Sequence, residues 1–298
     1  MPALINVNGR IDPPERAAVS PLDRGFLYGD SVYETVRAYA SIPFRLRAHL
    51  DRLRRSAARL EIPWEAAPVD VEAETRRTLE AAGEPEAAVR IVLTRGAGPI
   101  GYDVAACGPP AVVVYVRRCP DLPRGWREEG VDVAIVGVRR NAPDALDPAI
   151  KSGNLLNNFL AWREASRLRA YEPVLLNSRG LVAEGATSNV FAVRGGTLLT
   201  PPLEDGILEG ITRALVLELA RGAGIPVSEA SLTADALRGA DEAFLTSTLK
   251  GVVPIRRCDG WPIRHGRPGE VTLKVLERFE ACVQEETKTG SAPGAMRR

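Results

Sequence analysis

Two amphipathic helices are predicted near the N-terminus from the spacing of apolar residues. In residues 45–61, apolar side chains recur every three or four positions: Leu46, Leu50, Leu53, Ala57 and Leu60. A second helix is predicted over residues 69–82, ending at Gly83, a residue type that tolerates the backbone conformation found at helix C-termini. Later in the chain, helices are predicted from about Asn154 and from about Glu209.

Runs of β-branched residues predict strands between these helices. Two of them, AVRIVLTRG and AVVVYVRR, bracket a glycine-rich loop, and VDVAIVGVRR follows. Four shorter runs are also predicted as strands: PVLLN, LVAEG, NVFAVRGG and TLLTP. Residues 242–263 are predicted to form two strands closed by a turn at Asp259-Gly260. Because strands and helices intermix without regular βαβ alternation, the sequence predicts a mixed α/β (α+β) fold.

The chain is predicted to form two domains. Its 298 residues can bury two cores, and residues 121–130, which contain proline and glycine, are predicted to link them. The predicted N-terminal α/β domain covers residues 1–120, and the C-terminal α/β domain covers residues 131–284. Residues 285–298 show no hydrophobic periodicity and are predicted to be a disordered tail.

Composition excludes several classes of protein. The net charge of +1 offers no field that would attract nucleic acid or an anionic membrane. We find no apolar run of signal-peptide or membrane-spanning length, so a cytoplasmic protein is expected. Four widely spaced cysteines and two histidines argue against a disulfide framework and against a metal site.

Lysine is scarce, since only four of the 39 basic residues are lysines. One of them, Lys151, stands in the segment IKSGNLLNN just before a predicted helix. The positive end of a helix disfavours an ammonium ion, which would favour the neutral amine that attacks aldehydes to form a Schiff base. An exposed lysine ahead of a helix would give the same pattern, so this segment alone leaves both interpretations open.

Six motifs in order along the chain resemble those of one enzyme family: YGDSVYETVRAY, AHLDRLRRSA, IKSGNLLNN, VAEGATSNVF, LEGITRALV and EAFLTST. From about Pro21 to Glu277 the chain is similar to the fold-type IV aminotransferases, which bind pyridoxal 5'-phosphate. That family includes D-amino-acid transaminases, branched-chain transaminases and aminodeoxychorismate lyases. The resemblance implies a two-domain fold-type IV enzyme that forms a homodimer with shared active sites.

The resemblance also implies roles for particular residues. Lys151 would bind the cofactor covalently and act as the general acid and base, and Glu184 would keep the pyridine nitrogen protonated. The cofactor's phosphate would be held by four residues: Arg52, Ile211, Thr212 and Thr248. The residue types alone are equally compatible with a surface glutamate and with threonines that cap a helix or lie in a strand.

Substrate choice is less clearly indicated. Leu156 replaces the tyrosine that branched-chain enzymes carry five residues after the lysine, and Tyr33-Glu34-Thr35 replaces their Phe-Glu-Gly. Both departures favour the D-amino-acid or lyase branches. The D-amino-acid enzymes, however, place an arginine and a histidine where this chain has Ile100 and Tyr102.

The substrate carboxylate therefore needs another cation, and Arg90 or Lys250 is expected to supply it, with Tyr33 also contacting substrate. The expected activity is transfer of an amino group between an α-amino acid, with a D-amino acid favoured, and a 2-oxo acid such as 2-oxoglutarate or pyruvate. The alternatives are a branched-chain L-amino-acid transaminase and an aminodeoxychorismate lyase.

Overall fold

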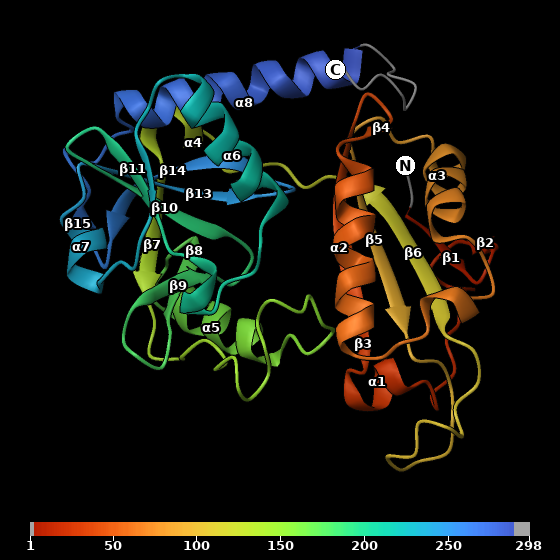
Figure 1. Cartoon of the computed structure of the whole chain (residues 1–298). Coiled ribbons are helices and arrows are strands. Elements are labelled where there is room, and N and C mark those ends of the chain that lie inside the picture. The colour runs from red at the N-terminus through yellow and green to blue at the C-terminus, as the bar shows by residue number, and fades with distance from the viewer. Residues whose placement is uncertain (1–2, 289–298) are drawn as a thin grey trace.

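The computed structural model describes residues 3–288, which form two halves that each contain one β-sheet (Figure 1). In the N-terminal half, the sheet has the strand order β2-β1-β6-β5-β3-β4, with all neighbours antiparallel. Its strands are β1 (Leu4–Val7), β2 (Arg10–Asp12), β3 (Ser31–Tyr39), β4 (Ile42–Pro43), β5 (Ala87–Thr94) and β6 (Ala111–Arg118). The mixed α/β fold class predicted from the sequence is confirmed.

The helices of this half cover one face of the sheet. The predicted helix over residues 45–61 is confirmed as α2 (Leu46–Arg59), and α3 (Val71–Ala82) starts two residues later than predicted, directly after its cap Asp70. The short helices are α1 (Arg24–Tyr28) and η1 (Trp64–Ala66). Alternate residues of β3 pack into the core formed with α2 and α3, which leaves Tyr33 and Thr35 on the opposite face, where they line a cavity.

The sheet of the C-terminal half mixes parallel and antiparallel pairs in the order β12-β11-β10-β13-β14-β7-β8-β9, with β15 paired to β14. Its strands are β7 (Val131–Ile135), β8 (Glu172–Leu176), β9 (Val182–Gly185), β10 (Asn189–Arg194), β11 (Thr197–Thr200), β12 (Val227–Glu229), β13 (Glu242–Ser247), β14 (Gly251–Cys258) and β15 (Trp261–Pro262). Its helices are α5 (Leu156–Arg167), η2 (Leu203–Asp205), α6 (Ile211–Gly222), α7 (Ala234–Arg238) and α8 (Glu270–Lys288).

The segment 242–263 differs from its prediction as a single hairpin. The turn at residues 248–250 joins β13 to β14, and the Asp259-Gly260 turn joins β14 to β15. The prediction missed the first turn because Thr248, Leu249 and Lys250 are not typical turn residues. This missed turn carries Thr248 and Lys250 into the cavity.

The predicted linker, residues 121–130, lies between β6 and β7 and includes the short helix α4 (Trp126–Glu129). The predicted tail is wrong for residues 285–288, which form the last turn of α8. That turn is anchored by an ion pair of 2.8 Å between Glu286 and Arg45, a contact that periodicity alone does not reveal. Residues 289–298 lie outside the described part of the chain.

Helix α8 connects the two halves. In Figure 1 it runs along one side of the C-terminal half and its end approaches β4. Phe279 on α8 packs edge-on against Phe44, with ring centres 6.3 Å apart, close to the Glu286–Arg45 pair.

Within residues 3–288, no helix is long and apolar enough to cross a membrane, and no cluster of three potential metal ligands occurs.

Candidate active site

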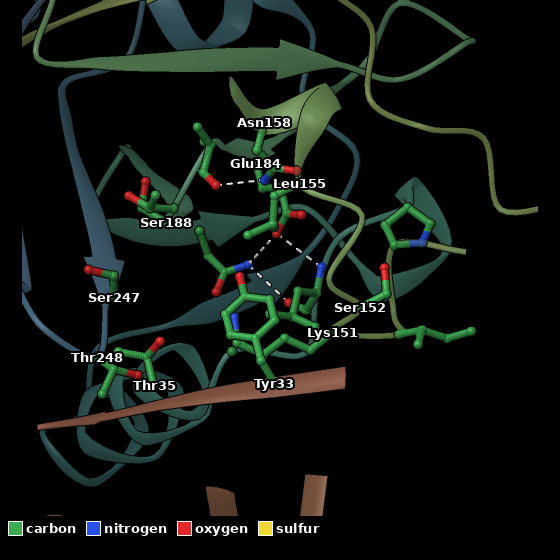
Figure 2. Close-up of a pocket in the computed structure, with 18 of the residues that line it drawn as sticks. Tyr33, Thr35, Lys151, Ser152, Leu155, Asn158, Glu184, Ser188, Ser247 and Thr248 are labelled. Atoms are coloured by element: carbon green, nitrogen blue, oxygen red, sulfur yellow. Dashed lines mark hydrogen bonds between the residues drawn. The ribbon is translucent and has the colours of Figure 1, made fainter. Parts of the chain in front are cut away.

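A cavity of about 570 Å³ is lined by residues from both halves. The nine residues predicted to bind cofactor or substrate all line it: Tyr33, Arg52, Arg90, Lys151, Glu184, Ile211, Thr212, Thr248 and Lys250. Figure 2 shows Tyr33, Lys151 and Glu184 gathered in this cavity, with Ser247 and Thr248 also drawn. Residues far apart in the sequence therefore come together in a space large enough for a small-molecule ligand.

Lys151 is held by its backbone while its amine stays unpaired. Its carbonyl accepts a hydrogen bond of 2.9 Å from the Tyr33 amide, and the adjacent Ser152 forms a β-bridge with Val32. Its Nζ lies 4.5 Å from the centre of the Tyr33 ring and has no hydrogen bond or ion pair with any residue from 3 to 288. A half-buried amine without a partner is available for a covalent bond with a ligand.

The helix that follows Lys151 begins farther along the chain than predicted. Helix α5 begins at Leu156 rather than near Asn154, so Lys151 lies five residues before it. The field of a helix terminus falls off within about one turn. The position of Lys151 therefore depends on its contacts with β3.

Glu184, at the end of β9, is buried, and each of its carboxylate oxygens is held by neighbours. Arg140 Nε donates to Oε1 at 2.9 Å, while Asn189 Nδ2 and the Leu208 amide donate to Oε2 at 3.2 and 3.0 Å. The Arg140 side chain is only 9% exposed, and sequence analysis missed it, since 44 residues separate it from Glu184. These contacts fix a carboxylate in the cavity and exclude the alternative of a surface glutamate in a turn.

The N-terminus of α6 opens onto the same cavity without a side-chain cap. Its N-cap residue is Gly210, and within the described chain the amides of Ile211 and Thr212 have no recorded acceptor. A Cβ at Gly210 would lie 2.0 Å from Asn189 Oδ1, so any other residue there would displace the Asn189 side chain. Free amides at the end of a three-turn helix are a favourable site for an anion.

Hydroxyl groups on β13 add to this anion site. Thr246 and Ser247 line the cavity, and their buried hydroxyl oxygens have no partner within residues 3–288. Thr248, in the turn that follows, also lines the cavity. Since buried polar groups in folded proteins are nearly always paired, orphaned hydroxyls on residues that line the same cavity as free helix amides fit a phosphate group.

Arg52 joins the two halves at this anion site. Its Nε and Nη2 donate to the Glu34 carboxylate at 2.6 and 2.9 Å, and its Nη1 donates to the Glu209 carbonyl at 2.6 Å. Burial raises the pKa of Glu34, but the Arg52 charge and the hydrogen bonds from His49 and Arg52 outweigh it and lower the pKa to about 2. Glu34 is therefore a carboxylate at neutral pH.

The two cations expected to bind a substrate carboxylate differ in their surroundings. Lys250 Nζ donates to Glu172 at 2.8 Å and to Thr187 Oγ1 at 2.9 Å, and Glu172 is only 1% exposed. The Arg90 guanidinium stacks on the Tyr33 ring at 3.9 Å and has no ion pair or hydrogen bond with any other described residue. The charge of Lys250 is thus already matched, whereas that of Arg90 is available.

Together these groups fit pyridoxal phosphate. The free amine of Lys151 suits its aldehyde, the fixed carboxylate of Glu184 suits its ring nitrogen, and the amides and hydroxyls at α6 and β13 suit its phosphate.

Comparisons with known proteins agree with this site. The family model for amino-transferase class IV matches residues 31–258. The chain is 40% identical to a Methanocaldococcus jannaschii protein provisionally named a branched-chain-amino-acid aminotransferase, over 93% of this chain and 95% of that protein. It is 33% identical to the D-alanine aminotransferase of Bacillus licheniformis, over 94% of this chain and 97% of that enzyme. The crystal structure of the T.th. branched-chain amino acid aminotransferase with pyridoxamine 5'-phosphate matches with a TM-score of 0.86 and 33% identity, over 97% and 95% of the two chains.

Proposed function

The chain belongs to the class IV aminotransferase family, and we propose that it transfers the amino group of a branched-chain L-amino acid to a 2-oxo acid such as 2-oxoglutarate. Membership confirms the resemblance read from the six motifs, the fold-type IV architecture and the use of pyridoxal 5'-phosphate. The observation that carries the amino-transfer part of the proposal is the unpaired amine of Lys151 in one cavity with Glu184 and the uncapped α6.

When bound, pyridoxal phosphate supplies an aldehyde carbon that takes up amines and a ring that accepts electrons from the substrate Cα. We propose that Lys151 Nζ holds the aldehyde at rest. The freed Nζ would take the proton from the substrate Cα and deliver it to the cofactor's aldehyde carbon, as amino transfer requires. The Glu184 carboxylate, oriented by Arg140 and Asn189, would hold a proton at the ring nitrogen.

The preference for a D-amino acid, predicted from the sequence, is not supported. The relative with 40% identity and the structural match described above both carry branched-chain names, although a D-alanine enzyme is 33% identical. One of the departures used for that preference, Leu156, is 68% exposed and is not among the residues lining the cavity. The cavity has many apolar lining residues, which favours an aliphatic substrate side chain: Leu146, Ile150, Leu155, Phe159, Leu208 and Leu249.

Half-reactions measured without a 2-oxo acid test this proposal. L-leucine, D-alanine and D-glutamate are mixed separately with the holoenzyme, and conversion of pyridoxal phosphate to pyridoxamine phosphate is followed by absorbance. We expect L-leucine to react at least about tenfold faster than either D-amino acid. Faster reaction with D-alanine would instead assign the chain to the D-amino-acid branch, and catalytic release of pyruvate from aminodeoxychorismate, with no amino acceptor, would indicate a lyase.

Arg90 is expected to matter more than Lys250 for binding the substrate carboxylate. Replacing Arg90 with glutamine should raise KM and lower kcat/KM roughly 30- to 1000-fold, because a desolvated carboxylate would lose its cation. That decrease corresponds to a loss of about 2–4 kcal/mol in transition-state stabilisation. Lys250→Ala should have a smaller effect on KM, since its ammonium is paired with Glu172.

An amine substrate without a carboxylate provides the control for both variants. Its turnover should fall little in Arg90→Gln, because it offers no negative charge for that side chain to meet. If Lys250→Ala raised KM for the amino acid more than Arg90→Gln did, the assignment of the two cations would be reversed.

We also propose a homodimer, which would cover apolar side chains that the single chain exposes. Ile100 and Tyr102 are 77% and 86% exposed in the loop between β5 and β6, yet Arg24 and Tyr28 tether that loop at Gly101. Sedimentation of the wild type should give a dimer or a multiple of one, and Ile100→Glu should weaken it. A fully active wild-type monomer would rule out shared active sites.

Two other expectations stay predictions. One is a cytoplasmic location. The other is independent folding of residues 1–120 and 131–284 as separate domains.

A further inference from the structure

Glu34 occupies a position that the alternation of β3 assigns to apolar residues. Val32, Val36 and Ala38 lie on the same face of the strand, and all three are fully buried in the core beneath α2. Glu34 lies between them and is also 0% exposed. A buried carboxylate is tolerated only when its charge and lone pairs are matched, so its partners indicate why it is kept.

Those partners come from successive turns of α2. Arg52 donates to both carboxylate oxygens of Glu34 in a bidentate ion pair, and His49 Nδ1 lies 2.7 Å from Oε2. Because Glu34 is ionised, it can only accept hydrogen bonds, so His49 must carry its proton on Nδ1. His49 is 1% exposed, so its ring is held in a fixed position beside the ion pair.

This arrangement determines how much of Arg52 is left for a ligand. A guanidinium has five N–H groups. Two donate to Glu34, and a third donates to the carbonyl of Glu209, the residue before the N-cap of α6. One N–H on each terminal nitrogen remains, on a side chain that lines the cavity. The guanidinium is thus held from both halves of the protein, with two donors kept for an anion.

We propose that Glu34 and His49 are positioning residues for recognition of the cofactor's phosphate and act through Arg52. This inference rests on the proposed function, because that function places a phosphate at the N-terminus of α6. Glu34 fixes the plane of the guanidinium, and His49 fixes the Glu34 carboxylate. Without them, Arg52 retains its charge but loses the orientation that presents its two remaining donors to phosphate.

The test compares pyridoxal phosphate with pyridoxal, which lacks the phosphate. Dissociation constants of both compounds are measured by absorbance on the full-length protein freed of cofactor, so the readout does not depend on turnover. In Glu34→Gln, the preference for pyridoxal phosphate over pyridoxal should fall by about 10- to 100-fold, as expected for disturbing one charge-assisted pair. Affinity for pyridoxal itself should change little.

A pair of variants at His49 tests whether this residue positions Glu34, and through it Arg52, without altering any charge at neutral pH. An asparagine can place an N–H donor close to where Nδ1 lies, so His49→Asn should restore most of the phosphate preference that His49→Leu loses.

Glu242→Gln is the matched control for Glu34→Gln: Glu242 is 5% exposed, accepts from the Thr272 amide at 2.8 Å and does not line the cavity. It should lower the melting temperature and leave the phosphate preference unchanged.

The proposal would be overturned if Glu34→Gln weakened both compounds equally, or if it bound pyridoxal phosphate as tightly as the wild type. Should Glu34→Gln fail to fold, equal phosphate preference in His49→Leu and His49→Asn would overturn it. A wild type that binds neither compound would instead refute the proposed function.

Discussion

Replacing Lys151 with alanine is expected to lower kcat for transamination on the order of 10³-fold or more. The variant loses both the amine that would hold the cofactor and the base that would move the Cα proton, and general acid–base catalysis alone contributes about 10² to 10⁴-fold. The fold should be retained, because the contacts that fix this segment are made by the backbone of Lys151 and by Ser152. Steady-state kinetics and thermal melting measure the two effects.

Two further lysine variants sharpen this test. Lys151→Arg keeps a positive charge but cannot act as the nucleophile, so it should be as inactive as the alanine variant. Lys274→Ala removes an exposed lysine whose ammonium donates to the Ala223 carbonyl, and it should be fully active. Activity of Lys151→Arg within about tenfold of the wild type would mean that another amine performs the reaction.

Glu184→Gln is expected to lower kcat on the order of 100-fold or more while leaving cofactor affinity nearly unchanged. The amide cannot keep a proton on the ring nitrogen, so the ring would accept electrons from the substrate less well. Some stability should also be lost, about 1–3 kcal/mol, since the amide brings an N–H group where Glu184 now accepts hydrogen bonds. Kinetics and melting curves separate these two losses.

Glu242→Gln serves as the stability control for this variant, because it changes another buried carboxylate outside the cavity. Its melting temperature should fall without a comparable loss of kcat. Glu184→Gln that transaminates at the wild-type rate would show that Glu184 is structural and that the cofactor ring lies elsewhere.

The local elements were predictable because their signals are local. The apolar spacing in α2 appears directly in the sequence, and Asp70 and Gly83 mark the ends of α3. The end of α8 was not predictable, because its last turn depends on the Glu286 contact with Arg45, 241 residues away.

Residues of the site could be located from motifs, but their partners could not. All nine predicted residues line one cavity, since each motif combines a backbone geometry with a fixed residue type. The pairing of Arg140 with Glu184 and of Glu172 with Lys250 crosses 44 and 78 residues, and nothing in either local sequence indicates it. The pairing of Glu172 with Lys250 leaves Arg90 as the candidate cation whose charge is unmatched.

One missed feature did leave a signal in the sequence. In Val32-Tyr33-Glu34-Thr35-Val36, an acidic residue interrupts the apolar phase of a strand, which is unfavourable unless a cation is buried with it. Substrate preference had no such signal. The departure at Leu156 was informative only if that residue faced the cavity, and the fold points it outward.

The most direct measurement is reduction of the pyridoxal phosphate-loaded protein with borohydride, followed by peptide mapping of the pyridoxyl label. Reduction makes the bond between the cofactor and its lysine permanent, so the labelled peptide identifies that lysine without any assumption about substrate. We expect the label on the peptide containing Lys151. A label on Lys250 or Lys274, with Lys151 unmodified, would contradict the proposed site and the mechanism built on it.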